Sequence, residues 1–308
     1  MPLYKNVAVF VKPTESLTVP LTVLIEVLEK AGAAVYLDER SAETLGGRAP
    51  SRGHTRDELG ALCDLAVVLG GDGTMLGVAR SLAPYRRPII GINAGRLGFI
   101  TDIVFDEVRE VLPAVLEGRC TSDVRRLLSG EIIRDGKVLY RNVAVNDIGV
   151  THGRAGGMVD FVIDVNGQQM SSQSADGIIC STATGSTAYA LASGGPILHP
   201  SLDGMVLVPV APHTLSSRPI VLPAGLTVTI EVTDARDAQA YFDMQEFFDM
   251  KPGDLIRIRM AEETLEMLHP QAASFQDRIA GILAEKLLLA AADTGRANNV
   301  PKLFVKEH

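Results

Sequence analysis

Apolar and polar positions follow two different periods in the first third of the chain. Segments 21–31 and 74–84 carry apolar residues at helical spacing, and Gly32 stands where the first of these helices would end. Short runs rich in Val, Ile, Leu and Ala, typical of buried strands, lie at 6–12, 33–38, 64–71 and 87–93. Because strands and helices alternate, the pattern predicts a mostly parallel sheet covered on both faces.

After about Leu127 the pattern changes to short strands with few helices between them. Apolar residues alternate over 159–165, and the Asn-Gly pair at 166–167 is the strongest short-range signal for a hairpin. Further strand-like runs lie at 205–212, 218–223, 226–234 and 254–261. In this half only 185–192 and 275–292 have a helical pattern, so a β-rich domain is predicted.

The change of pattern suggests how the domains divide. The 308 residues suit two domains of ordinary size. We expect an α/β domain over 1–126 and a β-rich domain over 127–274. The remaining segment, 275–308, is a candidate to return to the first domain.

Charge and cysteine content restrict the possible partners. The 29 Lys and Arg against 37 Asp and Glu give a net charge of −8, which argues against a nucleic-acid binder and against a polybasic membrane anchor. The three cysteines are widely spaced, so no disulfide framework is expected. The apolar run near the N-terminus is too short for a signal peptide, and Lys12 closes it. We therefore expect a soluble cytoplasmic protein with no nucleic-acid or membrane partner.

The sharpest chemical feature is the Gly-Gly-Asp-Gly-Thr sequence at 70–74, between a predicted strand and a predicted helix. Three glycines allow the backbone N–H groups to form an anion-binding nest beside a helix N-terminus, so phosphate is the expected ligand. A carboxylate beside phosphates is repulsive unless it binds Mg²⁺ or accepts a proton from a hydroxyl nucleophile. Asp72 therefore indicates phosphoryl transfer, and the alternative is a turn in which Asp72 only caps the helix.

A second motif, Asn-Ala-Gly-Arg-Leu-Gly-Phe at 93–99, follows the next predicted strand. Because the carboxyl ends of neighbouring parallel strands share one edge of a sheet, this motif is expected to lie close to Asp72. Arg96 is a candidate to bind the phosphates. A solvated arginine in a turn is an equally good interpretation.

A third group of polar residues lies in the β-rich half. It comprises Asn146-Asp147, the Asp176-Gly177 pair, and a segment at 181–189 with many Ser and Thr residues that ends in Tyr189. Hydroxyls with an aromatic ring can bind the edge and the face of a heterocycle. The alternative is a helix entry capped by Ser or Thr.

Several classes of enzyme are disfavoured because their motifs are absent. The six histidines contain no HxxxH pair, and GxSxG does not occur, so a zinc enzyme and a serine hydrolase rank low. The glycine-rich sequence is neither GxxxxGK[ST] nor GxGxxG, which excludes the mechanics of a P-loop or a dinucleotide fingerprint. No residue is assigned to a metal.

Taken together, these motifs resemble the NAD kinase family, which phosphorylates the 2′-hydroxyl of the adenosine ribose of NAD to give NADP. The sequence at 70–74 is shared with diacylglycerol, sphingosine and 6-phosphofructokinases. The motif at 93–99, the Asn-acidic pair and the segment at 176–197 are more particular, and they occur in the family's order. The resemblance implies a phosphofructokinase-like α/β N-terminal domain and a β-sandwich-like C-terminal domain that binds NAD.

The resemblance also assigns roles to residues. Asp72 is implied to be the catalytic base and a ligand contact, with Gly73 beside it. Asn146 and Asp147 match the pair that holds NAD, although many members have Glu where this chain has Asp147, and the shorter side chain reaches less far. The other implied dinucleotide contacts are Asp176, Thr184, Thr187, Ala188, Tyr189, Ala190, Leu191, Ala192, Ala211 and Gln245.

The family further implies the co-substrates and the assembly. ATP is expected with a divalent cation, Mg²⁺, NAD is the substrate, and the protein is expected to be a homo-oligomer, a dimer or a tetramer. Two alternatives remain at this point. One is a lipid or sugar kinase that shares the sequence at 70–74, and the other is a sensor that binds NAD(P) without catalysis.

Overall fold

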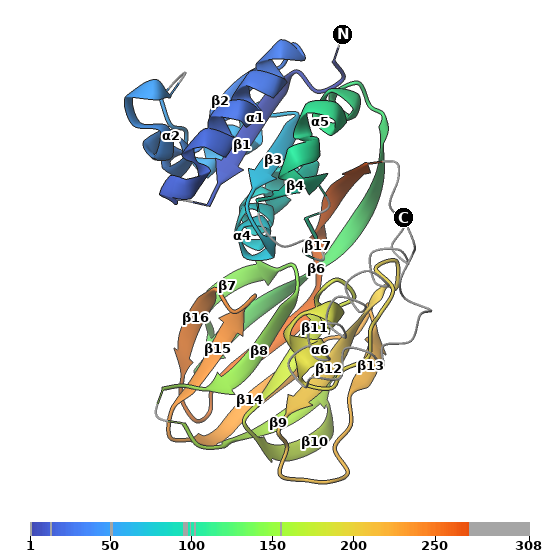
Figure 1. Ribbon diagram of the computed structural model, residues 1–308. Coiled ribbons are helices and arrows are strands. Elements are labelled where there is room, and N and C mark those ends of the chain that lie inside the picture. Colours follow the sequence, from blue (N-terminus) through green and yellow to red (C-terminus); the bar gives the residue numbers. More distant parts are fainter. Residues whose placement is uncertain are drawn as a thin grey trace, which may run out of the picture. The chain divides into compact units, whose positions relative to one another are not determined.

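The fold is described from a computed structural model that covers residues 2–12, 14–49, 52–94, 98, 100–101, 103–154 and 156–270 (Figure 1). The chain forms two compact units. Of the described residues, the first contains those up to Val78, Arg87–Asp123 and Met267–Pro270, and the second contains Ala79–Arg86 and Val124–Glu266. The expected segment 275–308 lies outside the described residues.

The first unit is built on a parallel sheet with the strand order β2-β1-β3-β4. Its strands are β1 (Asn6–Val11), β2 (Ala34–Leu37), β3 (Leu65–Leu69), β4 (Ile89–Asn93) and the short β5 (Ile103–Val104) beside β4. The end of β17 (Leu255–Pro270) adds a further parallel neighbour to β4, with Met267 opposite Ile89. The parallel sheet predicted from the alternating pattern is confirmed.

Helices cover this sheet because both of its faces are apolar. Val7, Val67 and Ile90 share one core with α1 and α5, while the intervening Phe10 and Val68 are buried as well. The helices are α1 (Thr18–Lys30), α2 (Glu39–Leu45), α3 (Arg56–Leu62), α4 (Asp72–Leu82) and α5 (Val108–Leu116). Short 3₁₀ turns lie at η1 (Glu15–Leu17), η2 (Gly46–Arg48), η3 (Ala83–Tyr85) and η4 (Phe105–Glu107). None of the described helices is long and apolar enough to cross a membrane.

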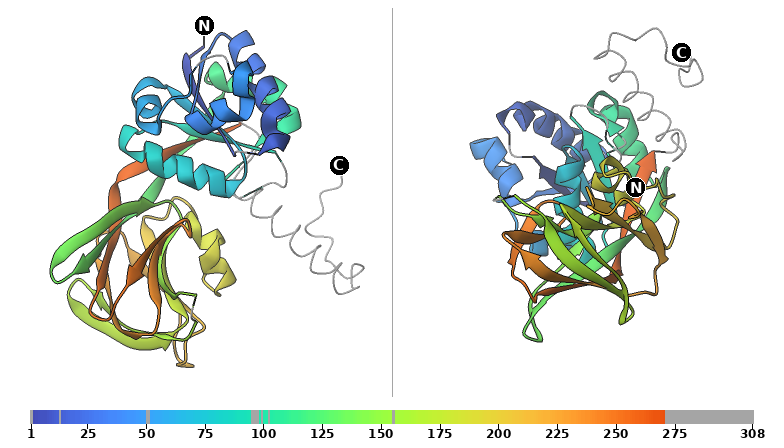
Figure 2. Two further views of the ribbon diagram at one scale, coloured as in Figure 1. Left: turned by 90° about the vertical axis from the view of Figure 1, so that its left-hand side faces the viewer. Right: turned by 90° about the horizontal axis from the view of Figure 1, so that it is seen from below.

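The second unit consists of two sheets (Figure 2). In one sheet the order is β10-β9-β14-β17, with β6 pairing β17 and β7. The other has the order β13-β12-β11-β8-β15-β16. The strands are β6 (Cys120–Arg134), β7 (Lys137–Ala144), β8 (Asp147–His152), β9 (Val159–Val165), β10 (Gln168–Ala175), β11 (Gly177–Thr182), β12 (Gly204–Val210), β13 (Ile220–Pro223), β14 (Val228–Ala235), β15 (Ala238–Phe242) and β16 (Glu246–Met250).

The core of this unit lies between the two sheets. Phe161 and Ile230 of the first sheet are buried in the same cluster as Ile178 and Phe242 of the second. The predicted hairpin between β9 and β10 is present, and its Asn166 and Gly167 both have positive φ, as a type I′ turn requires. An α/β unit and a β-sandwich unit confirm the predicted fold class.

Candidate functional site

The glycine-rich turn lies where β3 ends and α4 begins. The N–H of Gly70 donates to the carbonyl of Ile92 in the neighbouring strand, at 2.9 Å, and the carbonyl of Gly71 accepts from the N–H of Thr74 at 3.0 Å. A Cβ on Gly70 would stand 2.7 Å from Oγ1 of Thr74, so the tight turn requires a glycine at that position. Asp72 is the first residue of the helix.

The side chain of Asp72 is held by groups from the following loop. Its Oδ1 accepts hydrogen bonds from the N–H of Ile100 at 3.3 Å and from the hydroxyl of Thr101 at 3.2 Å. Nδ2 of Asn93, at the end of β4, donates to the Thr101 hydroxyl at 3.1 Å. Asn93 and Thr101 are both buried, so this chain of hydrogen bonds restricts rotation of the partly exposed Asp72 carboxylate. The expected proximity of the two loop motifs is confirmed.

The second motif needs a glycine at position 98. A Cβ at this position would collide with the carboxylate of Asp72, so only glycine lets the loop approach it. Arg96, the candidate phosphate ligand, lies outside the described residues. Thr101 was not singled out from the sequence, because a threonine after a loop carries no signal until its partner is known.

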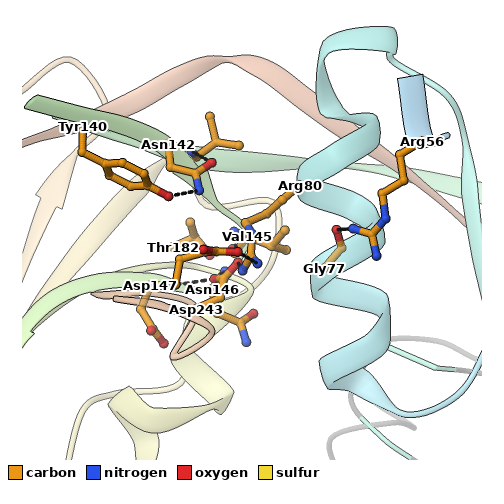
Figure 3. A network of polar contacts seen from close by, with 12 residues as sticks. Arg56, Gly77, Arg80, Tyr140, Asn142, Val145, Asn146, Asp147, Thr182 and Asp243 are labelled. Carbon is orange, nitrogen blue, oxygen red and sulfur yellow. Dashed lines mark hydrogen bonds and ion pairs between the residues drawn. The ribbon is translucent and has the colours of Figure 1, made fainter. Parts of the chain in front are cut away.

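The Asn146-Asp147 pair forms a tight turn at the start of β8 in the second unit (Figure 3). The carbonyl of Asn146 accepts from the N–H of Thr182 at 2.8 Å and from the hydroxyl of Ser181 at 3.1 Å. A Cβ on Gly185 would collide with that same carbonyl. The hydroxyl-rich segment and the Asn-Asp pair, far apart in the sequence, are therefore packed against each other.

Asp147 is almost fully buried, with 2% of its surface exposed. Its Oδ1 has no hydrogen-bond partner among the described residues. Burial and, to a smaller extent, the nearby charge of Asp243 together raise the pKa of this carboxyl to about 8. The neutral form of Asp147 is therefore favoured at pH 7.

Two tyrosines, Tyr241 and Tyr189, share the environment of Asp147 with Asp176. Tyr241 is fully buried opposite Gly149, and its hydroxyl has no partner among the described residues. Its ring meets that of Tyr189 edge to face, with centroids 6.4 Å apart. Burial raises the pKa of Tyr189, and the charges of Asp176 and Asp147 raise it as well. The structure thus brings Asp147, Asp176 and Tyr189 together, and adds Tyr241, which the sequence analysis missed.

The segment from Thr184 to Ala192 leaves β11 through η5 (Gly185–Thr187) and α6 (Tyr189–Ala192). The hydroxyl of Thr187 donates to the carbonyl of Thr184 at 3.2 Å, so it helps to build the turn. The side chain of Ala190 is buried in an apolar cluster, which leaves only its backbone to contact a ligand. Nη1 of Arg125, a buried arginine that the sequence analysis also missed, donates to the hydroxyl of Thr184 at 3.3 Å.

The last two predicted contacts lie in loops of the second unit. Ala211 follows β12, has φ +44°, and stands next to the Val210 carbonyl, which accepts from the N–H of Asp176 at 3.0 Å. Gln245 is exposed in the turn between β15 and β16, where its N–H donates to the carbonyl of Phe242 at 3.0 Å. The two loops therefore begin beside residues already assigned to the site.

Comparison with known proteins identifies the family to which this chain is similar. The ATP-NAD kinase N-terminal domain matches residues 7–120, and the ATP-NAD kinase C-terminal domain matches residues 145–269. The NAD kinase of Cupriavidus pinatubonensis is 49% identical over 251 residues, 82% of each chain. The NAD kinase of Paraburkholderia phymatum is 47% identical over 257 residues, 83% of this chain and 85% of the relative.

Solved structures show the same fold. Yeast NADH kinase complexed with NADH superposes with a TM-score of 0.81 at 24% identity, covering 92% of this chain and 88% of that chain. The NAD kinase from Archaeoglobus fulgidus in complex with ATP superposes with a TM-score of 0.68 at 24% identity, covering 96% of this chain and 100% of that chain.

The fold and the glycine-rich turn define a class of phosphotransferases that use a hydroxyl acceptor. Within that class, the chain belongs to the NAD kinase family. It is an enzyme, a kinase of NAD, which decides against the lipid or sugar kinase and against the sensor without catalysis.

Proposed function

We propose that this chain transfers the γ-phosphoryl group of ATP to the 2′-hydroxyl of the adenosine ribose of NAD, with Asp72 as the general base. The observation that carries this proposal is the Asp72 carboxylate at the glycine-rich turn, held in orientation by Thr101 and Ile100. Phosphoryl transfer has a loose transition state, so placement of the hydroxyl matters more than its basicity. Asp72 accepts the proton late in the transfer.

The second unit supplies the residues that we assign to NAD. Asn146, Asp147 and Tyr189 lie within one packed region, together with Thr184 and Asp176. Most of NAD is remote from the reacting hydroxyl, so contacts to its other parts can orient that hydroxyl for in-line attack. Gly73, Thr187, Ala188, Ala190, Leu191, Ala192, Ala211 and Gln245 complete the proposed set.

ATP and a divalent cation are proposed at the glycine-rich turn. The described residues contain no group of three or more His, Cys, Asp or Glu that could hold a metal by themselves. Mg²⁺ commonly binds through substrate phosphates and one or two carboxylates, and the position of Asp72 fits a cation that arrives with ATP. When bound, the cation would neutralise charge on the phosphates.

The two solved relatives support this choice of ligands, since one was crystallised with NADH and the other with ATP. Assembly as a homo-oligomer, a dimer or a tetramer, remains part of the proposal. Light scattering tests this assembly by measuring the mass of the protein in solution, and the mass of a monomer would contradict the proposal.

The proposed reaction is tested by incubating the protein with ATP, Mg²⁺ and NAD, and by locating the new phosphate with ³¹P NMR. A 2′-phosphate that an NADP-specific dehydrogenase accepts is the expected result. Diacylglycerol and fructose 6-phosphate serve as control acceptors and should stay unmodified. Phosphate on any other hydroxyl of NAD would overturn the proposed regiochemistry.

A further inference from the structure

A buried aspartate that the proposed mechanism does not use organises the turn before β8. Asp243 lies between β15 and β16, has φ +52°, and is 5% exposed. Its Oδ1 accepts from the N–H groups of Asn146 at 2.7 Å and of Asp147 at 3.2 Å. Its Oδ2 accepts from the N–H of Val145 at 3.1 Å. Three consecutive peptide donors thus converge on one carboxylate (Figure 3).

An arginine from α4 completes this arrangement. Nη1 of Arg80 lies 3.0 Å from Oδ2 of Asp243, and only 9% of the arginine side chain is exposed. Nη2 of Arg80 also lies 3.7 Å from the exposed carboxylate of Glu246. Burial raises the pKa of Asp243, while the three peptide N–H groups and the charge of Arg80 act in the opposite direction. These contacts favour the ionised form, which accepts all of these hydrogen bonds.

The backbone held by Asp243 is the backbone that presents the proposed NAD residues. Asn146 is fixed on its N–H side by Asp243, and on its carbonyl side by Thr182 and Ser181. The N–H of Asp243 in turn donates to the carbonyl of Asp147 at 2.8 Å. All of these contacts are made to backbone, so they define where the Asn146 and Asp147 side chains begin.

We propose that Asp243 and Arg80 form a buried ion pair that positions the Asn146-Asp147 turn for NAD. Both are positioning residues, because they act through the turn and not on the ligand. The inference rests on the proposed function of Asn146 and Asp147 as NAD contacts. It adds the residues that set their geometry, for which the sequence carried no motif.

Asp243→Asn is the direct test, because it keeps the shape of the side chain and removes the charge that three peptide donors and Arg80 share. We expect the Kd for NAD, measured by calorimetry, to rise by about 10–100-fold, because the side chains of Asn146 and Asp147 would be displaced from their binding positions. The Kd for ATP should stay within about twofold. The KM for NAD should rise while kcat at saturating NAD changes little.

The chain offers a matched control for the loss of a buried ion pair. Asp254 is 1% exposed, binds Arg134 through two contacts of 2.7 Å, and also accepts from the N–H of Lys251. Asp254→Asn should lower the Tm without changing the Kd for NAD. If Asp243→Asn weakens NAD binding no more than Asp254→Asn does, the pair only stabilises the fold and the proposal is wrong.

Variants of Arg80 test the same ion pair independently, in case the Asp243→Asn protein does not fold. Arg80→Lys preserves the charge and should keep NAD affinity within a few-fold of the original, whereas Arg80→Met should weaken it by at least tenfold. Equal effects of Lys and Met would contradict a role for the charge.

Asn146→Ala and Asp147→Ala separate this inference from the proposed function. If neither changes the Kd for NAD, the assignment of the turn to NAD fails, and the inference fails with it. If both weaken NAD binding and Asp243→Asn does not, only the inference fails.

Discussion

Replacing Asp72 with asparagine keeps the size of the side chain and removes its ability to accept a proton. We expect Asp72→Asn to lower kcat by about 10²–10⁴ while the Kd for NAD stays unchanged, because only the transition state needs the base. NADP formation and calorimetric binding measure the two quantities. A kcat within a few-fold of the original protein would remove Asp72 from this role.

Thr101 provides the control for that prediction. Thr101→Val removes the hydroxyl that donates to Asp72 but leaves the carboxylate able to accept a proton. Its effect on kcat should therefore be smaller, about tenfold, which corresponds to one hydrogen bond to a charged group. Equal losses in the two variants would mean that Asp72 acts through its orientation alone.

Asp147 is predicted to bind the 3′-hydroxyl of the ribose, since the 2′-hydroxyl must stay free to attack phosphorus. As a neutral acid at pH 7 it makes a neutral hydrogen bond, so Asp147→Ala should lower kcat/KM for NAD by about 2–10-fold. Above its pKa of about 8 the acid is ionised, and the loss should grow to roughly 10–150-fold. With 3′-deoxy-NAD the substitution should cost almost nothing at either pH. Equal losses on both substrates would exclude the 3′-hydroxyl as the partner.

Individual residues differ in how far the sequence reveals them. Asp72 lies in a motif, so its chemistry can be read from the residue types around it. Asp243 and Tyr241 carry no such signal, because their importance comes from burial and from partners about a hundred residues away along the chain. The pKa of Asp147 is hidden for the same reason, since burial is a property of the fold.

At the level of elements, segments with a clear apolar pattern can be predicted from the sequence, and those without one cannot. The helix expected at 21–31 is α1, which begins three residues earlier at Thr18. α3 has only seven residues, too few for a clear period, although its Thr55 and Glu58 form a capping box. β11 is buried on both faces, between the sheets and beneath α6, so its sequence does not alternate.

The contact between η5 and the Asn146 turn leads to a prediction about stability. Gly185→Ala should lower the stability by about 1–3 kcal/mol and weaken NAD binding, because the added methyl group must displace the Asn146 carbonyl. Gly225→Ala is the control, since no atom lies within 4 Å of its added Cβ. Chemical denaturation measures the free energy of unfolding. An unchanged value for Gly185→Ala would contradict the packing described.

At the scale of the whole molecule, Asp147 predicts how stability depends on pH. Its pKa is about 8 in the folded protein and about 3.9 when unfolded, so between these values the folded state holds a proton that the unfolded state has lost. Its contribution is fully present below about pH 4 and declines as pH rises to about 8. The nearby charge of Asp243 favours the same neutral form, while Tyr241, Tyr189 and Cys180, whose pKa values are raised, stay uncharged over this range.

Asp147→Asn should remove this dependence. The Tm of the variant minus the Tm of the original protein should increase from pH 5 to pH 8 and level off above pH 8. Asp254 should behave oppositely, since its bond to Arg134 helps to hold its pKa below the usual value. For Asp254→Asn, the stability deficit should shrink as pH falls through that lowered pKa. A pH-independent difference for Asp147→Asn would mean that this carboxyl is charged in the fold.

The pairing of Met267 with Ile89 has a consequence for synthesis on the ribosome. The first unit takes one of its parallel strands from a segment that is translated after the entire second unit. At about 5–20 residues per second, the edge of β4 at Ile89 waits on the order of ten seconds for this partner, although β5 can already pair with the other end of the strand. During that interval part of an apolar strand edge is open to neighbouring nascent chains, so we expect this edge to be a site of aggregation while the protein is being made.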